Sequence, residues 1–465
     1  TRTVLAGDKT AKEALAEAQA ALLGQPPETD VVSTPAAKAT PVPAGDVTTI
    51  RFVPPLLATA HYEKLADAFE EAHPTLRLDI WDRLLSDDSL ETLAKRGDCF
   101  AWWDLFPIPT EHESILSLQP LLEADTGFPL ADFYPQILDT GRWKGGLWAL
   151  PYAFSLPVIR YNKDLFDAAG VAYPQPGWTW DDFLEKAVAL SDGEGMSKQY
   201  GFAVLQIYHI RQFVRQQAGP LLDVTTEPPW PRLDDPAVVG ATRRLADLVR
   251  LYHVMQPIAI PQNPKDVFDE LLRRQAMRDS GKVAMWIEQS TALYMDDETQ
   301  FQKGTASLPQ GEGSVEVSGC FLYISADSAH PEVCWEWFKF LTARQYPRGG
   351  AIPARRSLAE SDTFRERVGD EAAEALLFSV KRSDNIGLQV DSAYPQLGRI
   401  VYWFERAYVN VVDGMDAEQA LGDAQRKAEA YVVCLKEREG FGDRRVALAC
   451  AREADPEYRG WRGDE

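Results

Sequence analysis

Aromatic and acidic side chains stand at the ends of several strand-like segments. They are Trp102, Trp103 and Asp104 in DCFAWWDLF, Gln206 and Tyr208 in YGFAVLQIY, and Trp230 between prolines in EPPWPRL. Tryptophan and tyrosine rings offer rigid, flat, apolar area, and carboxylates form charge-assisted hydrogen bonds with hydroxyl groups. This combination suits a ligand with an apolar face and a rim of hydroxyls. The alternative is that these side chains pack in the core or, in the case of Trp230, against a turn.

Residues of the kinds that carry catalysis form no recognisable constellation. The six histidines (61, 73, 112, 209, 253 and 330) make no HExxH, HxH or Cys/His cluster. GEGSVE and GEGMSK lack the third glycine and the strand–helix context of a nucleotide loop, and no GxSxG is present. The acidic residues single out no pair for glycoside hydrolysis. We therefore expect no catalytic residue, no metal site and no cofactor.

Composition restricts the class of protein. The chain has 465 residues, too many for a single core, and carries 48 Lys+Arg against 70 Asp+Glu, a net charge of -22. Nucleic-acid binding needs a basic surface, so it is not expected. No apolar run is long enough to span a bilayer, and no signal peptide opens the sequence. If the protein is exported, its signal is absent from this chain.

Strand-like and helix-like segments alternate from Val47 onward. TTIRFV (48–53), TLRLDIW (75–81) and DCFAWWDLF (98–106) read as strands, and GKVAMWI (281–287) and GCFLYIS (319–325) follow later. Helical patterns lie between them; one begins with a capping box in TWDDF, where Thr179 is the N-cap and Asp182 its reciprocal acceptor. Such alternation predicts α/β units. Ligands of these sheets lie beyond the carboxyl ends of the strands, so the loops 54–61, 81–88 and 102–110 are candidates.

The first 46 residues differ from the rest. Residues 8–24 read as a helix, and STPAAKATPVPAGD (33–46) has the composition of an extended linker. Residues 8–24 align without gaps on residues 414–430, and the two segments have identical Ala, Leu and Gln residues at several positions. We interpret residues 1–32 as a helical tail that ends a preceding, similar domain of a tandem protein, although alanine-rich helices also match by chance.

Cys434 and Cys450 are close in sequence, and a bridge between them would close a short loop. Such a loop stabilises by about 3 kcal/mol on the chain-entropy model and suits an oxidising compartment. Two unpaired buried thiols are the alternative. Cys334 lies in a helical apolar series with Trp337 and Leu341, which predicts a core position, and an odd total leaves at least one thiol unpaired.

Several segments, taken in order, resemble the bacterial extracellular solute-binding proteins of family 1, which include the maltodextrin receptors of ABC transporters. They are GGLWALPYAFSLPVIRYNKDLFDAAGV (145–171), GWTWDDF (177–183), GKVAM (281–285), SGCFLYISADSAHPEVCWEWFKFLTARQ (318–345), AIPARRS (351–357) and GMDAEQALGDAQ (414–425). Each motif is weak alone. Their order and spacing over roughly residues 47–432 make the resemblance specific.

The resemblance implies a periplasmic-binding-protein-like type II fold, in which two α/β lobes flank a ligand cleft and are joined by hinge crossings. Lobe 1 would comprise 47–156 and 319–372, and lobe 2 would comprise 157–318 and 373–465. It further implies capture of a mono- or oligosaccharide by hinge closure and delivery to the permease of an ABC importer. The protein would be monomeric and extracytoplasmic, in the periplasm or at the outer cell surface, where lipid anchoring is one mode of attachment.

The resemblance also implies site residues. Trp102 lies where such receptors have a stacking tryptophan, and further contacts are expected from each lobe: Tyr152, Ser155, Trp286, Glu288, Ser290, Arg355, Tyr394 and Trp403. One departure is PPLLAT, where Leu56 and Leu57 replace polar residues, so a polyol or a cation in an aromatic cage remains an alternative ligand. A ligand-sensing receptor domain and a carbohydrate-active enzyme are the competing functions.

Overall fold

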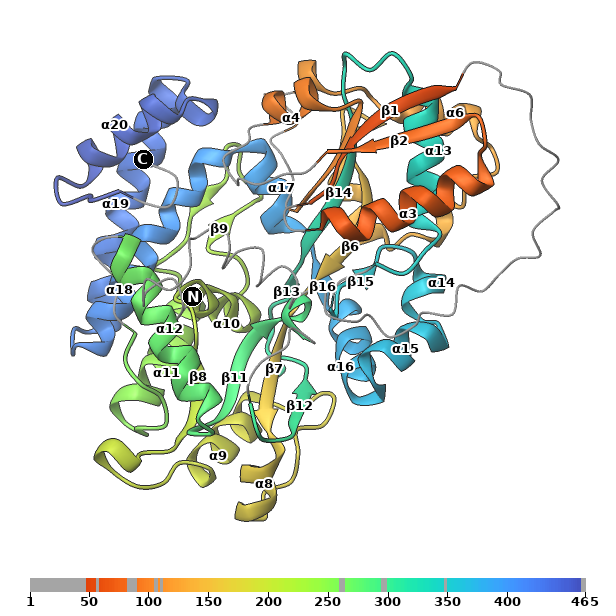
Figure 1. Ribbon diagram of the computed structural model, residues 1–465. Helices are drawn as coiled ribbons and strands as arrows, with labels where there is room; N and C mark the ends of the chain where they lie inside the picture. Colours follow the sequence, from red (N-terminus) through yellow and green to blue (C-terminus); the bar gives the residue numbers. More distant parts are fainter. Residues whose placement is uncertain are drawn as a thin grey trace, which may run out of the picture.

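The computed structural model describes residues 47–55, 58–81, 90–103, 108, 112–258, 264–293, 299–346 and 349–460. The helical tail and the linker expected before residue 47, and Leu56, Leu57 and Asp104, lie outside the described residues. The described chain forms two α/β lobes side by side, with α17 (Ile386–Ala393) between them (Figure 1). No helix of the described part is both long and apolar enough to cross a bilayer.

The first lobe contains a six-stranded sheet that draws on distant parts of the chain. Its order is β15 (Ile352–Pro353), β6 (Leu150–Ser155), β14 (Ser318–Ile324), β3 (Cys99–Trp103), β1 (Thr48–Val53) and β2 (Leu76–Ile80). Strands β1, β2 and β3 are parallel, whereas β14 runs antiparallel to both β3 and β6. Residues 320–324 of β14 are fully buried because elements cover both faces of the sheet, which explains the unbroken apolar run.

Helices pack on the first sheet with the apolar faces that the sequence pattern predicts. In α3 (Thr59–Ala72) the buried residues Tyr62, Ala66 and Phe69 recur at helical spacing. The rings of Phe52 and Phe69 both contact Trp337 of α13 (Pro331–Thr342) edge to face. The other helices of this lobe are α4 (Leu90–Arg96), α6 (Gln119–Ala124), α7 (Pro135–Leu138), α14 (Arg356–Ala359), α15 (Asp362–Val368) and α16 (Asp370–Val380).

The second lobe contains a four-stranded sheet of order β12 (Lys303–Ala306), β7 (Pro157–Asn162), β11 (Val283–Gln289) and β8 (Tyr200–Val204). Its helices are α8 (Lys163–Ala169), α9 (Trp180–Ala189), α10 (Tyr208–Ala218), α11 (Pro236–Arg250), α12 (Pro264–Asp279), α18 (Ile400–Val412), α19 (Ala417–Glu437) and α20 (Arg444–Ala454). The predicted capping box starts α9: Thr179 Oγ1 accepts from Asp182 N at 3.2 Å, and Asp182 Oδ2 accepts from Thr179 N at 2.7 Å.

The predicted disulfide is present: Cys434 of α19 and Cys450 of α20 are bridged, with their Cα atoms 5.6 Å apart. The bridge joins two consecutive helices of the second lobe. Cys99, Cys320 and Cys334 are buried and are not disulfide-bonded in the structure.

Core membership shows where the chain passes between lobes. The first passage lies within β7, between Val158 of the first core and Ile159 of the second; a later one lies between Leu308 and Val315, and the last lies between Leu388 and Leu397. Leu293, between β11 and β12, also packs in the first core. The last passage differs from the expected boundary at residue 373. The reason is that α16 buries Ala373, Leu376 and Val380 in the first core, and a helical apolar stripe does not reveal which core it faces.

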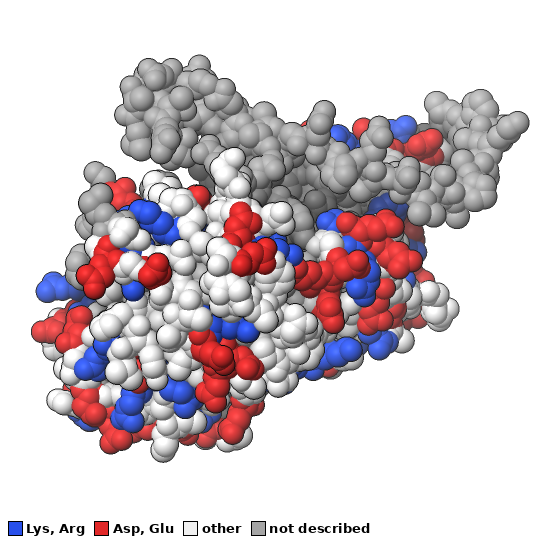
Figure 2. Space-filling view, turned by 90° about the horizontal axis from the view of Figure 1, so that it is seen from below, with Lys and Arg blue, Asp and Glu red and all other residues white. Residues whose placement is uncertain are grey.

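Charged side chains of both signs are interspersed over the face of the molecule seen from below (Figure 2). No continuous basic track is visible among the described residues of that face. Nucleic acid would need such a track.

Candidate ligand site at the junction of the lobes

A small pocket lies at the junction of the two cores. Its volume is about 60 Å³. It is lined by α10 and the segment around β9 (Leu222–Asp223) of the second lobe, by β13 (Val315–Glu316), by α17, and by η6 (Pro395–Arg399) with the start of α18. Apolar side chains such as Leu221, Val390 and Leu397 form most of its wall, and Arg211, Arg215, Glu316 and Asp391 add charges. We call this the interlobe pocket.

Ion pairs across the interlobe pocket join α10 to the chain segments that cross between the lobes. Arg211 Nη2 lies 3.3 Å from Glu316 Oε2, and Arg215 pairs with Asp384. Glu316 and Asp384 belong to the neighbouring strands β13 and β16 (Ser383–Asp384), which pair in parallel. Burial acts to raise the pKa of Glu316, but Arg211 and then Arg215 outweigh it, so the pKa is lowered and the carboxylate stays charged.

Gly387 is needed for this arrangement. A Cβ at this position would lie 1.8 Å from Glu316 Oε1, so a side chain on α17 would displace the carboxylate. The lack of a side chain at Gly387 therefore lets α17 approach the Arg211–Glu316 pair closely.

Of the residues expected in the site, Tyr208 is the one most directly connected to the interlobe pocket. It begins α10, one turn before Arg211, and contributes to the electrostatic surroundings of that guanidinium together with Glu316, Asp391 and Glu405. Gln206 lies just before the helix and is exposed. Both follow the carboxyl end of β8, where α/β sheets present their ligand-binding residues.

Trp102 and Trp103 end β3 and are both half-buried. Trp103 Nε1 donates to Tyr346 Oη at 3.1 Å, and the ring of Tyr346 also packs edge-on against that of Tyr152, with centroids 4.9 Å apart. Trp103 and Tyr152 are thus brought together by Tyr346, which sequence reasoning missed because it follows α13 with no local motif. Burial raises the pKa of the Tyr152 hydroxyl.

Ser155 and Ser290 meet at the first passage between the lobes. Ser155 Oγ donates to Gln289 Oε1 at 3.4 Å, and Ser290 Oγ accepts from Leu156 N at 3.3 Å. Both serines are almost fully buried. Their hydroxyls therefore hold the passage from β6 to β7 against the end of β11.

Glu288 lies near that passage, between two arginines. Its carboxylate is 3.2 Å from Arg278 Nη1 and 4.0 Å from Arg160 Nε. Burial raises the pKa of Glu288, and Arg278 and Arg160 act in the opposite direction. This carboxylate is thus already engaged by protein cations.

The expectation that Trp286 and Trp403 present their rings to ligand needs correction. Trp286 is 1% exposed and packs with Ala203 and Leu205 in a small separate cluster. Trp403 is 2% exposed, and its Nε1 donates to Asp455 Oδ2 at 3.0 Å. Both rings are core residues in this structure because helices cover the faces from which they project.

Three other expected residues contact partners away from the interlobe pocket. Trp230 Nε1 donates to Glu429 of α19 at 3.3 Å, Arg355 Nε pairs with Asp132 at 2.8 Å, and the ring of Tyr394 packs edge-on against Phe441. Each of these contacts lies within one lobe and helps to fix a loop or a helix end.

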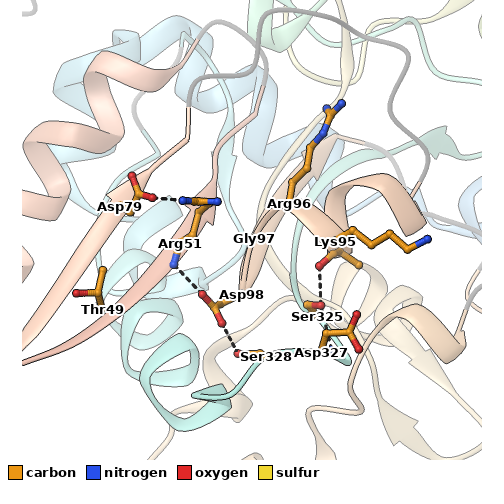
Figure 3. A pocket seen from close by; sticks show the side chains of 11 residues that line it. Thr49, Arg51, Asp79, Lys95, Arg96, Gly97, Asp98, Ser325, Asp327 and Ser328 are labelled. Atoms are coloured by element: carbon orange, nitrogen blue, oxygen red, sulfur yellow. Dashed lines mark hydrogen bonds and ion pairs between the residues drawn. The ribbon is translucent and has the colours of Figure 1, made fainter.

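A larger pocket, of about 390 Å³, lies elsewhere in the first lobe (Figure 3). It is found where α4 ends, β3 begins and β14 ends, so it faces the amino end of β3. Arg51 Nε pairs with Asp79 at 2.7 Å, and Asp98 accepts from Arg51 N and from Ser328 Oγ. Because ligands of α/β sheets bind at the carboxyl ends of the strands, the interlobe pocket is the better candidate despite its small volume.

His61 lies on the first turn of α3, beside Tyr62, and gives this lobe a pH dependence. Burial, and to a smaller extent Lys64, lowers its pKa from 6.5 to about 4. The unfolded chain therefore binds a proton below pH 6.5 that the folded protein does not bind until about pH 4, so folding stability is lost as pH falls through this window.

We expect the parent protein to lose up to about 3 kcal/mol more unfolding free energy than His61→Gln between pH 7 and pH 4. Urea unfolding of both proteins at several pH values measures this difference. Titration of the Asp and Glu side chains affects the stability of both proteins equally, so it cancels in the comparison. Identical pH profiles would show that His61 is not buried in its neutral form.

The sequence of the chain is similar to those of known proteins. The sequence profile of the family described as bacterial extracellular solute-binding protein matches residues 58–346. The chain is 32% identical over 125 residues to a mannitol-binding protein of Pseudomonas aeruginosa, a match that covers 25% of this chain and 28% of that protein. It is 22% identical over 339 residues to a putative binding protein of Brucella abortus, covering 68% of this chain and 78% of that protein.

Solved structures agree in fold. A substrate-binding protein of Listeria monocytogenes in complex with cycloalternan is 19% identical, with a TM-score of 0.66 over 85% of this chain and 100% of that one. A sugar-binding protein of Xanthomonas citri is 20% identical, with a TM-score of 0.65 over 85% and 100%. The protein UgpB of Mycobacterium tuberculosis, in complex with glycerophosphocholine, is 18% identical, with a TM-score of 0.64 over 84% of this chain and 99% of that one. These likenesses establish the two-lobed fold.

Proposed function

Because this chain belongs to the bacterial extracellular solute-binding proteins, we propose that it captures a neutral sugar or sugar alcohol outside the cytoplasm and delivers it to the permease of an ABC importer. The observation that carries this proposal is the interlobe pocket, to which elements of both cores contribute. A ligand held there would contact both lobes at once. Its binding would therefore favour the arrangement in which the lobes are close together.

The charges around the interlobe pocket support a ligand rich in hydroxyl groups. Arg211 and Arg215 are balanced by Glu316 and Asp391 in the wall of the pocket, so the lining carries no net charge, which suits a neutral ligand. Carboxylates accept hydrogen bonds from hydroxyls and repel an anionic ligand. A mannitol-binding relative and a sugar-binding structural neighbour fit the same ligand class.

We propose that the first lobe contributes Trp102, Trp103 and Asp104, and that the second contributes Gln206 and Tyr208. Trp103 already donates its indole N–H to Tyr346, so it would offer the ligand its ring face. Tyr208, next to Arg211, would offer a ring and a hydroxyl. Closure of the lobes would bring the two groups to opposite sides of the ligand, and the protein would act as a monomer.

A thermal-shift screen tests the ligand class. Neutral sugars, linear sugar alcohols, acidic sugars and quaternary amines are compared at equal concentration. A ligand present at 100 times its Kd should stabilise the folded protein by about 2.7 kcal/mol. We expect a neutral sugar or sugar alcohol to raise the melting temperature. A shift produced only by an acidic sugar or a quaternary amine would contradict the proposal.

A further inference from the structure

Two buried cysteines of the first lobe come from chain segments that are far apart in sequence. Cys99 is the first residue of β3, and Cys334 lies in the first turns of α13. Both side chains are fully buried. Sequence reasoning predicts only that Cys334 is a core residue, and proposes no partner for it.

The packing of α13 brings the two thiols together. Trp337 lies one helical turn after Cys334, on the same face, and its ring centroid is 5.7 Å from that of Phe52. Phe52 of β1 pairs in register with Cys99 of β3. Cys334 therefore faces the start of β3, and burial, followed by contact with the Cys334 side chain, raises the pKa of the Cys99 thiol.

The third cysteine of the first lobe, Cys320, is positioned differently. Cys320 pairs with Trp103 at the far end of β3, whereas Cys99 pairs with Ile324. Four residues of strand correspond to about 13 Å, and a disulfide needs Cα atoms within about 7 Å. Cys320 is therefore out of reach of Cys99, and its sulfur lies 4.0 Å from Tyr346 Oη.

We propose that Cys99 and Cys334 form a second disulfide when the chain folds in an oxidising compartment. The Cys434–Cys450 bridge indicates such a compartment independently, because disulfides persist where thiols are not kept reduced. Each thiol gives up its proton, and the two electrons pass to a disulfide of a thiol oxidant, which becomes a dithiol.

The bond forms during folding, before the core closes. Burial and the contact with Cys334 raise the pKa of the Cys99 thiol, so the thiolate that attacks a disulfide is scarce in the folded protein. The new bond would join the two chain segments that build the first lobe, and it would enclose the whole second sheet between its ends.

Counting thiols tests the proposal. The chain has five cysteines. The protein is secreted into an oxidising compartment, purified without reductant, and titrated with a chromogenic thiol reagent in guanidinium. Two bridges leave one thiol, that of Cys320. Three thiols would mean that Cys434–Cys450 is the sole bridge, which would overturn the proposal.

Single cysteine variants show which thiols are bridged. Cys320→Ser should lower the count from one to zero, and Cys334→Ser should raise it to two, because Cys99 loses its partner. Mass spectrometry of a non-reduced digest should find the peptides of Cys99 and Cys334 joined. A peptide pair that joins Cys320 to either of them would refute the assignment. No ligand enters these measurements, so the result is independent of the proposed function.

Discussion

Trp102→Ala is expected to weaken ligand binding by about 1–3 kcal/mol, roughly 5- to 150-fold in Kd, while the melting temperature stays close to that of the parent. Trp102 is half-buried at the end of β3, and it packs at the border of the first core. A ring in this position loses few core contacts when it is truncated. A sugar stacked on it would lose a rigid apolar platform.

Trp286→Ala is the matched control, since this ring also belongs to a strand, β11, but is 1% exposed. Its truncation should lower the unfolding free energy by about 3–5 kcal/mol and leave the Kd of the remaining folded protein unchanged. Calorimetric titration with the best ligand of the thermal screen, together with denaturant unfolding, separates the two variants. If Trp102→Ala unfolds as easily as Trp286→Ala and retains its Kd, Trp102 is a core residue and the proposed site is wrong.

Arg215→Met should lower the unfolding free energy by about 3 kcal/mol. The Arg215 side chain is 6% exposed, and its guanidinium pairs with Asp384. Methionine replaces much of the aliphatic volume but leaves Asp384 without its cation in a mostly buried place. The estimate is at the lower end for buried pairs, because Asp384 keeps 23% of its side chain exposed.

The double variant Arg215→Met/Asp384→Asn separates lost packing from an uncompensated charge. Removing the second charge should restore part of the stability, because what destabilises most is a buried charge without a partner. Arg51→Met is the surface control: the Arg51–Asp79 pair is about half exposed and should be worth less than about 1 kcal/mol. If urea unfolding shows that Arg215→Met and Arg51→Met lose the same amount of unfolding free energy, the Arg215–Asp384 pair is exposed to solvent and the prediction is wrong.

Much of the fold could be predicted from the sequence, because hydrophobic periodicity and cap chemistry are local. The run TTIRFV coincides with β1, and GCFLYIS differs from β14 by one residue. The start of α9 was predicted from Thr179 and Asp182 alone, since both hydrogen bonds of the box lie within four residues. Cys434 and Cys450 were paired on spacing, which works when two helices follow each other directly.

The candidate site was harder to predict, because exposure depends on the elements that pack on a strand or helix. Trp102 and Trp286 both belong to strands, β3 and β11, yet α12 and its neighbours bury only Trp286. Arg211, Glu316 and Asp391 were missed altogether, because their proximity arises from three chain segments that meet at the lobe junction. No local pattern carries that information.

The central position of β14 in the first sheet has a consequence for how the chain is made. Residues 318–324 fill the gap between β6 and β3, so an emerging chain reaches residue 155 with both of these strands lacking a neighbour. The second sheet is complete at Ala306, before the first can close. Pairing across such separations is slow, and strands with open edges pair readily with other chains. The interval between residues 155 and 318 is therefore when this protein is most prone to aggregate.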